Sequence, residues 1–228
     1  MYRERTQITF RFMSIKTDIV KQLVIALCLA ISVLLASTSF AHEKNTVYIY
    51  HDEGVSEESL TQTIATFETL LTKYAIKTIN AEQVKSRVWT QDAALFVMPG
   101  GADLPYTKKL NGKGNDIIKR YVKDGGAFLG ICAGSYYASS YVEFDKNGPL
   151  EVLGNRELSF FKGRAVGPIL APYDYKTQSG ARAAKIRTIL TDVTVFYNCG
   201  GFFENAESYP NTKVIATYEN NLPAIIFV

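Results

Sequence analysis

The sequence contains little histidine, little cysteine and little net charge. Its 228 residues include two His and three Cys, and the formal net charge is only +3. Three cysteines are too few for a disulfide-based scaffold, and no group of His, Cys, Asp and Glu has the spacing of metal ligands. A phosphate-binding loop is also absent, since residues 110–114 lack the Walker spacing and a preceding strand. We therefore expect neither a metal nor a cofactor.

The small positive charge lies entirely in the first 41 residues. That stretch holds five basic and two acidic residues, which leaves 20 of each sign in the rest of the chain. Without a net positive charge or a run of Lys and Arg, nucleic acid is not an expected partner. An apolar content of 47% with so little net charge also excludes an intrinsically disordered chain.

Residues 1–41 have the features of a secretory signal peptide. Residues 23–36 form an uncharged apolar run, two lysines precede it, and small residues stand at Ser39 and Ala41. A bilayer span needs about 20 residues, so this run is short for one. We expect cleavage after Ala41 and a periplasmic or secreted protein, with Met13 as a possible true start. The alternative is a membrane anchor formed by the uncleaved segment.

Residues 42–228 alternate between strand and helix patterns and are interpreted as one domain. Continuous apolar strands followed by amphipathic helices are typical of a parallel sheet covered on both faces. The fold class predicted is therefore α/β, with a doubly wound, mostly parallel sheet. The expected strands are 46–50, 76–79, 93–97 and 127–131, and the expected helices are 60–74, 81–87, 116–123 and 133–140.

The pattern is less regular after residue 141. Turn residues occur at 146–149, 162–164 and 179–180. Further strands are expected at 185–190, 193–197, 213–218 and 224–228. The last of these looks like a buried strand that stops at the final residue. We expect from this that the C-terminal end is truncated.

The clearest chemical signal is the segment from Gly130 to Gly134. An apolar strand runs into Gly-Ile-Cys-Ala-Gly, and a helical segment follows. This order is typical of a nucleophile elbow, in which a sharp strand-to-helix turn exposes the nucleophile, here Cys132. Gly130, Ala133 and Gly134 leave room for the turn, and the N–H group of Ala133 can stabilise an oxyanion. The alternative is an inert buried cysteine.

A second turn ends the preceding strand. Gly100 and Gly101 follow it at the sheet edge where parallel α/β proteins bind their ligands. Backbone N–H groups of this turn are candidate oxyanion donors. We expect Asp103 to cap the next helix rather than to act in catalysis.

These segments together resemble the biotin–protein ligase N-terminal domain family, within the class I glutamine amidotransferase-like superfamily. The resemblance implies a flavodoxin-like fold, Cys132 as the nucleophile and the Gly100–Gly101 loop beside it. It does not imply biotin ligation, because the ligase activity of multidomain members belongs to a separate catalytic domain. The matching segments are residues 97–106, 125–138, 142–144, 154–163 and 197–203.

The sequence departs from the superfamily in its catalytic base. Amidotransferases carry His-x-Glu after their last strands, and this chain has no histidine downstream of Cys132. Its histidines are His42, beside the leader, and His51, which we expect to be a solvated loop residue. Glutamine hydrolysis is therefore not expected of the chain as it stands, and whether it is an enzyme stays open. If active, it would form a thioester at Cys132 with an amide-bearing small molecule. The alternatives are a non-catalytic binding module and a fragment of a longer active protein.

Several further residues are candidates for the pocket. Asn198 and Cys199 lie where the family has a glycine-rich turn; Cys199 either pairs with Cys132 as a disulfide or, as we prefer, stays a separate thiol. Tyr136 either lines the pocket mouth or packs on the sheet. The resemblance makes Arg156 and Glu157 a pocket pair, although a surface ion pair is the preferred interpretation.

Overall fold

The computed structural model describes residues 43–174, 177 and 179–228, of which Lys44–Val228 form one compact unit. The first half of the unit is built on a four-stranded parallel sheet of order β2-β1-β3-β4. Its strands are β1 (Thr46–Tyr50), β2 (Ala75–Ile79), β3 (Ala93–Met98) and β4 (Ala127–Gly130). The α/β fold class is thus confirmed.

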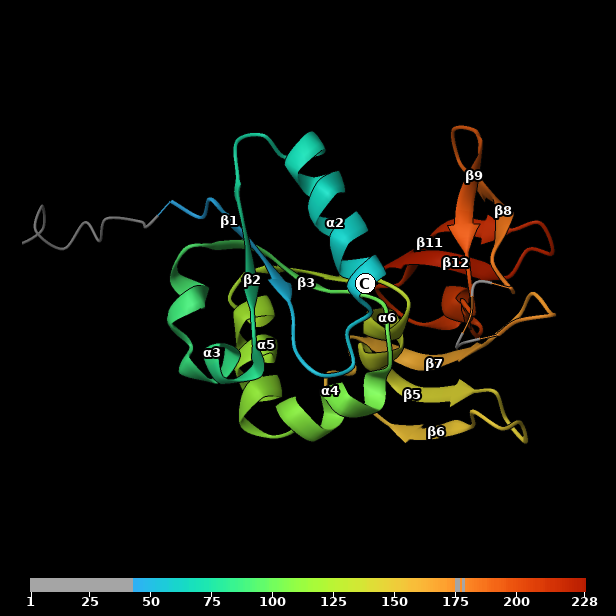
Figure 1. Cartoon of the computed structure of the whole chain (residues 1–228), viewed down its shortest axis with the longest axis horizontal. Coiled ribbons are helices and arrows are strands. Elements are labelled where there is room, and N and C mark those ends of the chain that lie inside the picture. Colours follow the sequence, from blue (N-terminus) through green and yellow to red (C-terminus); the bar gives the residue numbers. More distant parts are fainter. Residues whose placement is uncertain (1–42, 175–176, 178) are drawn as a thin grey trace, which may run out of the picture. The chain divides into compact units, whose positions relative to one another are not determined.

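Helices cover both faces of this sheet (Figure 1). Val47 and Ile49 of β1 pack with Leu60 of α2 (Glu57–Leu70) on one face. Phe96 and Met98 of β3 are buried on the other face, under helices that Figure 1 shows on the opposite side from α2. Those helices are α3 (Ala81–Ser86), the 3-10 turn η1 (Val88–Gln91), α4 (Asp103–Leu110) and α5 (Lys113–Lys123).

The second half of the unit forms two further four-stranded sheets. One has the order β10-β7-β5-β6, in which β5 and β7 are parallel and the other pairs antiparallel. The third sheet, β12-β11-β8-β9, is antiparallel throughout. The strands are β5 (Ser139–Phe144), β6 (Val152–Asn155), β7 (Phe161–Gly167), β8 (Arg182–Thr188), β9 (Asp192–Tyr197), β10 (Phe202–Phe203), β11 (Lys213–Tyr218) and β12 (Pro223–Phe227), with the 3-10 turn η2 (Ala206–Ser208) before β11.

This arrangement corrects the prediction of one mostly parallel sheet. The parallel sheet stops at β4, and the later pairs β5–β6, β8–β9 and β11–β12 are joined by connections too short for a crossover helix, so they are antiparallel. The β8–β9 connection, for example, is a tight turn in which Thr188 N–H donates to Thr191 O.

Local structure differs from the prediction in several places. The helix predicted from 133 ends at Tyr137 as α6 (Ala133–Tyr137), and the next residues begin β5. The turn predicted at 162–164 lies inside β7, where the ring of Phe161 packs over Gly163. Helix α4 is the helix expected after the Gly100–Gly101 turn, for which no range was predicted. The last strand is half-exposed rather than buried, with Phe227 69% exposed.

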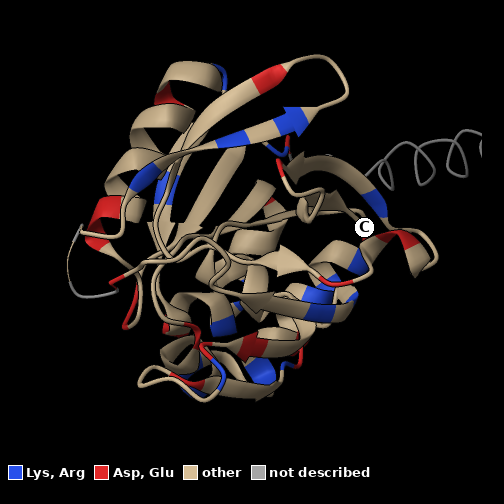
Figure 2. Cartoon of the chain, turned by 90° about the vertical axis from the view of Figure 1, so that its right-hand side faces the viewer, with Lys and Arg blue, Asp and Glu red and all other residues tan. Residues whose placement is uncertain are grey.

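The predicted leader, residues 1–41, lies outside the described residues, as does His42. None of the described helices is long and apolar enough to cross a membrane. Figure 2 shows basic and acidic positions interspersed on the face that it presents.

Candidate functional site

Cys132 lies in a sharp turn between β4 and α6. Its backbone has φ 51° and ψ −113°. A positive φ is uncommon for a residue with a Cβ and costs of order 1–3 kcal/mol. The turn places Cys132 at the carboxyl edge of the parallel sheet, directly before the first residue of α6.

The two glycines beside Cys132 allow the helix to pack closely on the sheet. A Cβ on Gly134 would lie 2.0 Å from the Met98 carbonyl oxygen, and one on Gly130 would lie 2.5 Å from the Gly134 carbonyl oxygen. Neither glycine lines the cavity described below. Their role is therefore the close approach of α6 to β3.

Two backbone N–H groups donate hydrogen bonds to the Cys132 thiol. They belong to Ala133 and Gly101, and both lower the pKa of the thiol. Burial has the larger effect and raises that pKa, and the nearby charge of Asp103 raises it further. The net result is a thiol whose pKa lies above its ordinary value, facing two donors that would stabilise negative charge.

The Gly100–Gly101 turn is held by the loop before α2. Ser56 N–H donates to Gly100 O at 3.0 Å, and Gly100 N–H donates to Ser59 Oγ at 2.9 Å. Gly101 has φ 146°, and a Cβ there would lie 2.0 Å from the Gly54 carbonyl oxygen. Because the Gly100 N–H is already bonded to Ser59, the donor that this turn offers to the thiol is the N–H of Gly101. This corrects the expectation that both glycines serve.

A cavity of about 1120 Å³ is lined by Cys132 and by residues from three other parts of the unit. One wall comes from α2 and its N-terminal cap, and most of its side chains are polar. The opposite wall comes from the third sheet and β10 and is mostly apolar or aromatic. The α2 wall consists of Ser56, Glu58, Ser59, Gln62, Thr63, Thr66 and Phe67, and the sheet wall of Ile186, Val195, Phe196, Tyr197, Phe202, Phe203, Tyr218 and Ala224.

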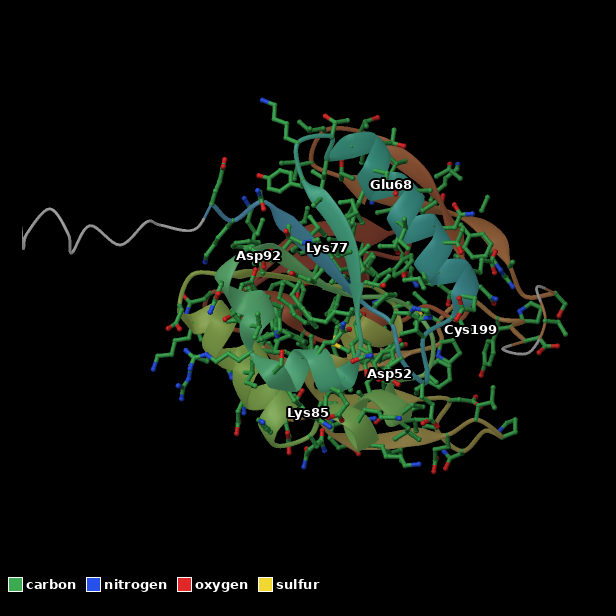
Figure 3. The ribbon with its side chains drawn as sticks, turned by 60° about the vertical axis from the view of Figure 1, so that its left-hand side comes forward. Asp52, Glu68, Lys77, Lys85, Asp92 and Cys199 are labelled. Atoms are coloured by element: carbon green, nitrogen blue, oxygen red, sulfur yellow. The ribbon has the colours of Figure 1, made fainter. Side chains whose placement is uncertain are left out.

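Asn198 and Cys199 line the same cavity from the loop after β9. Cys199 also has a positive φ, 58°, and is buried. Its thiol and that of Cys132 are both free, and Cys132 is partly exposed. Burial raises the Cys199 pKa, and the charge of Cys132 adds to that rise. Figure 3 shows Cys199 toward the N-terminal end of α2, whose far end is marked by Glu68. The structure therefore brings the two cysteines to one cavity as separate thiols.

Asp103 and Arg156 form a buried ion pair outside the cavity. Arg156 Nε donates to Asp103 Oδ2 at 2.7 Å, and both side chains are less than 10% exposed. The N-cap of α4 is Ala102, so Asp103 does not cap the helix as predicted. The predicted surface ion pair between Arg156 and Glu157 is also wrong. Glu157 accepts instead from Gly112 N–H at 2.7 Å and from the side chain of Asn115 at 2.9 Å.

Tyr136 lines the cavity and is also packed against two glycines. A Cβ on Gly167 or on Gly201 would lie 2.1 Å or 2.0 Å from its hydroxyl oxygen. Burial, followed by the charge of Cys132, raises the Tyr136 pKa well above its ordinary value. Tyr137 does not line the cavity; its hydroxyl donates to Asn115 Oδ1 at 2.7 Å in the core.

His51 is half-exposed and contacts Glu57 at 3.2 Å. It does not line the cavity, and it is the one histidine among the described residues. Across residues 43–174, 177 and 179–228, no three His, Cys, Asp or Glu side chains come together as a metal site.

The third-sheet wall and Ser59 were missed by the sequence analysis. Strands were predicted at 185–190 and 193–197 and appear as β8 and β9, but nothing in the pattern linked those strands to Cys132. Ser59 follows the capping Ser56 by one helical turn, a spacing that places both on the same side of α2.

Comparison with known proteins gives consistent relatives. The chain is 36% identical over 196 residues to the biotin–protein ligase of Schizosaccharomyces pombe, covering 80% of this chain and 31% of the ligase. It is 36% identical over 186 residues to an uncharacterized protein of Chlamydia muridarum, covering 78% and 70% of the two chains. Among solved structures, a ThuA-like protein of Bacteroides uniformis matches with a TM-score of 0.48 at 10% identity, covering 80% and 71%.

The chain thus spans about a third of the ligase that it resembles. The sequence profile of the family described as "Biotin-protein ligase, N terminal" matches residues 45–225, almost the whole of the described unit. The chain therefore belongs to the biotin–protein ligase N-terminal family.

Proposed function

We propose that the chain binds an amide-bearing small molecule in the cavity and transfers its acyl group to Cys132. The observation that carries this proposal is the Cys132 thiol in a positive-φ turn, facing the N–H groups of Ala133 and Gly101. In the first step the Cys132 Sγ–carbon bond forms and the carbon–nitrogen bond of the amide breaks. The thiol proton leaves with the departing amine, and water or another acceptor then takes the acyl group from the thioester.

The same N–H groups would hold the carbonyl oxygen as it gains negative charge. Preorganised backbone donors of this kind contribute about 2.7–4 kcal/mol each in hydrolases that use them. They favour the transition state because they are fixed by the Gly54–Ser56 loop and by α6 before the substrate arrives.

A thiol nucleophile needs a neighbouring base or cation to become a thiolate. No histidine is found among the described residues that line the cavity. Since burial raises the Cys132 pKa, the thiolate is a minor form at neutral pH. Acyl transfer by this chain should be slow at pH 7 and faster at higher pH.

Two finer assignments belong to the same proposal. The order β2-β1-β3-β4 matches the first four strands of the flavodoxin-like order and supports a class I glutamine amidotransferase-like fold for the first half. The apolar run at 23–36 supports export to the periplasm or beyond. Biotin ligation is not included, because the chain spans 31% of the ligase that carries that name.

Acyl transfer can be tested with glutamine and 3-phenylpropanamide at pH 7 and pH 9.5. Ammonia release and the intact mass of the protein are measured, and hydroxylamine is used to trap the thioester. We expect an acyl adduct on the wild-type protein and none on Cys132→Ala, with similar melting temperatures. Absence of both adduct and ammonia at pH 9.5, in a folded wild-type protein, would contradict the proposal.

A non-catalytic binding module is the second candidate, and the raised Cys132 pKa favours it. In that case Cys132→Ala binds 3-phenylpropanamide as tightly as the wild-type protein does, and neither releases ammonia. Adduct formation that depends on Cys132 would exclude this candidate.

A further inference from the structure

We propose that the amide taken by the cavity carries a bulky apolar group, best an aromatic ring, which packs against the third sheet. This inference rests on the proposed function only in placing the amide at Cys132. The inference adds the chemistry of the rest of the ligand. An amide group alone would fill only a small part of a cavity of about 1120 Å³. That volume lies just above the usual range for sites that bind drug-sized ligands, about 300–1,000 Å³.

The two walls of the cavity differ in chemistry. The wall from α2 presents hydroxyl and amide side chains such as Ser59, Gln62 and Thr66. The opposite wall presents Ile186 from β8, Val195 and Phe196 from β9, and Ala224 from β12. Figure 1 shows α2 and the third sheet on neighbouring sides of the unit. A ligand that satisfies both walls has a polar and an apolar part.

The tyrosines of the third sheet present rings rather than hydroxyls. Tyr197 O–H donates to Gly200 O at 2.6 Å, and Tyr218 O–H donates to Gly201 O at 3.0 Å. The two rings stand edge to face with centroids 6.2 Å apart. Because their hydroxyls are already bonded to the loop, these residues offer apolar ring surface to a ligand, and aromatic groups pack well on such edges.

Phe196 gives the strongest indication of an apolar occupant. Its side chain lines the cavity and is 66% exposed. Covering exposed apolar area is favourable by roughly 25 cal/mol per Å². A benzyl group that buries about 100 Å² would gain up to about 70-fold in affinity by that constant. We expect about tenfold, because part of the ring stays in contact with water.

The test compares iodoacetamide with N-benzyliodoacetamide as probes of Cys132. In both reactions Sγ displaces iodide, so the sulfur–carbon bond forms, the carbon–iodine bond breaks and the thiol proton goes to water. Rates are read at the Cys132 peptide by mass spectrometry and divided by the rates of free cysteine. The corrected rate for the benzyl probe should exceed that for iodoacetamide about tenfold.

Two phenylalanine variants give a matched pair. Phe196→Ala should lower the tenfold ratio to about threefold. Phe227→Ala removes a side chain of similar exposure, 69%, that does not line the cavity, and should leave the ratio unchanged. Both positions are exposed, so neither variant should affect folding. A corrected ratio near one in the wild-type protein, or an equal loss in both variants, would overturn the inference.

Failure of the proposed function gives a different result. If iodoacetamide itself does not alkylate Cys132, acyl transfer to that thiol is contradicted, and binding is then measured on Cys132→Ala. N-benzylacetamide should raise the melting temperature of that variant more than acetamide does at equal concentration. Equal shifts would refute the apolar subsite whatever the reactivity of the thiol.

Discussion

Replacing Gly134 by alanine should damage the turn at Cys132 more than any exposed glycine substitution does. The added Cβ would lie 2.0 Å from the Met98 carbonyl oxygen, 2.7 Å from its carbon and 2.8 Å from the Met98 Cβ. Real Cβ atoms do not approach backbone so closely, so α6 or β3 has to shift. Met98 is fully buried in the parallel sheet, which leaves α6, and with it Cys132, as the part that moves.

The expected loss of stability is about 3 kcal/mol. Overpacking a well-packed core costs about 1–3 kcal/mol, and a clash with the Met98 backbone, which cannot move aside as a side chain can, belongs at the upper end. For a unit of this size, each kcal/mol lowers the melting temperature by about 2–4 °C, so a fall of about 6–12 °C is expected. Gly112→Ala is the control for backbone strain: Gly112 has a positive φ, 75°, whereas Gly134 does not, and nothing lies within 4 Å of a Cβ at Gly112. It should cost about 1 kcal/mol through backbone strain alone.

Thermal and urea unfolding of both variants measure this difference. Alkylation of Cys132 by iodoacetamide, measured on the folded proteins, should slow in Gly134→Ala and stay unchanged in Gly112→Ala. The reasoning is refuted if Gly134→Ala is no less stable than Gly112→Ala, because the close approach of α6 to β3 would then not exist.

Three further outcomes follow from the contacts around the site. The rate of Cys132 alkylation should rise with pH, with a midpoint above the ordinary thiol value, because burial raises the pKa and only the thiolate reacts; a midpoint at or below that value contradicts the geometry. Asp103→Asn should destabilise the fold by about 3–5 kcal/mol in urea unfolding, because it leaves Arg156 buried without its partner. It should also shift the Cys132 alkylation midpoint to lower pH, because the charge that raises the thiol pKa is removed. Ser59→Ala should cost about 1 kcal/mol, as the Gly100 N–H loses its acceptor; an unchanged urea midpoint would show that the bond contributes nothing.

The parallel sheet could be predicted because its strands are buried on both faces. Residues 93–98 are apolar throughout, so periodicity and burial agree, and β3 appears where it was expected. The same holds for β1, whose side chains alternate between two helical layers. The range of helix α4 was not predicted, although a helix was expected there; its Pro105 lies in the first turn, where proline is tolerated.

The turn at Cys132 was predictable from local sequence, and the ion pair of Asp103 was not. A strand, Gly-x-Cys-x-Gly and a helix are neighbours along the chain, so their geometry follows from short-range sterics. Asp103 and Arg156 are 53 residues apart, and their contact depends on how α4 meets the loop after β6. Sequence adjacency instead suggested a pair with Glu157, which faces the start of α5.

Packing against Tyr136 explains the glycines at positions 167 and 201. The Tyr136 hydroxyl lies about where a Cβ of Gly167 or Gly201 would be, so larger side chains at either position would collide with it. Tyr136 belongs to α6, four residues after Cys132, while Gly201 follows Cys199 by two. Helix α6 therefore fixes the path of the loop that carries Cys199, and through it the position of the second thiol at the cavity. Both cysteines are held by one packing arrangement rather than by two independent turns, which is why local sequence could predict the first cysteine and not its relation to the second.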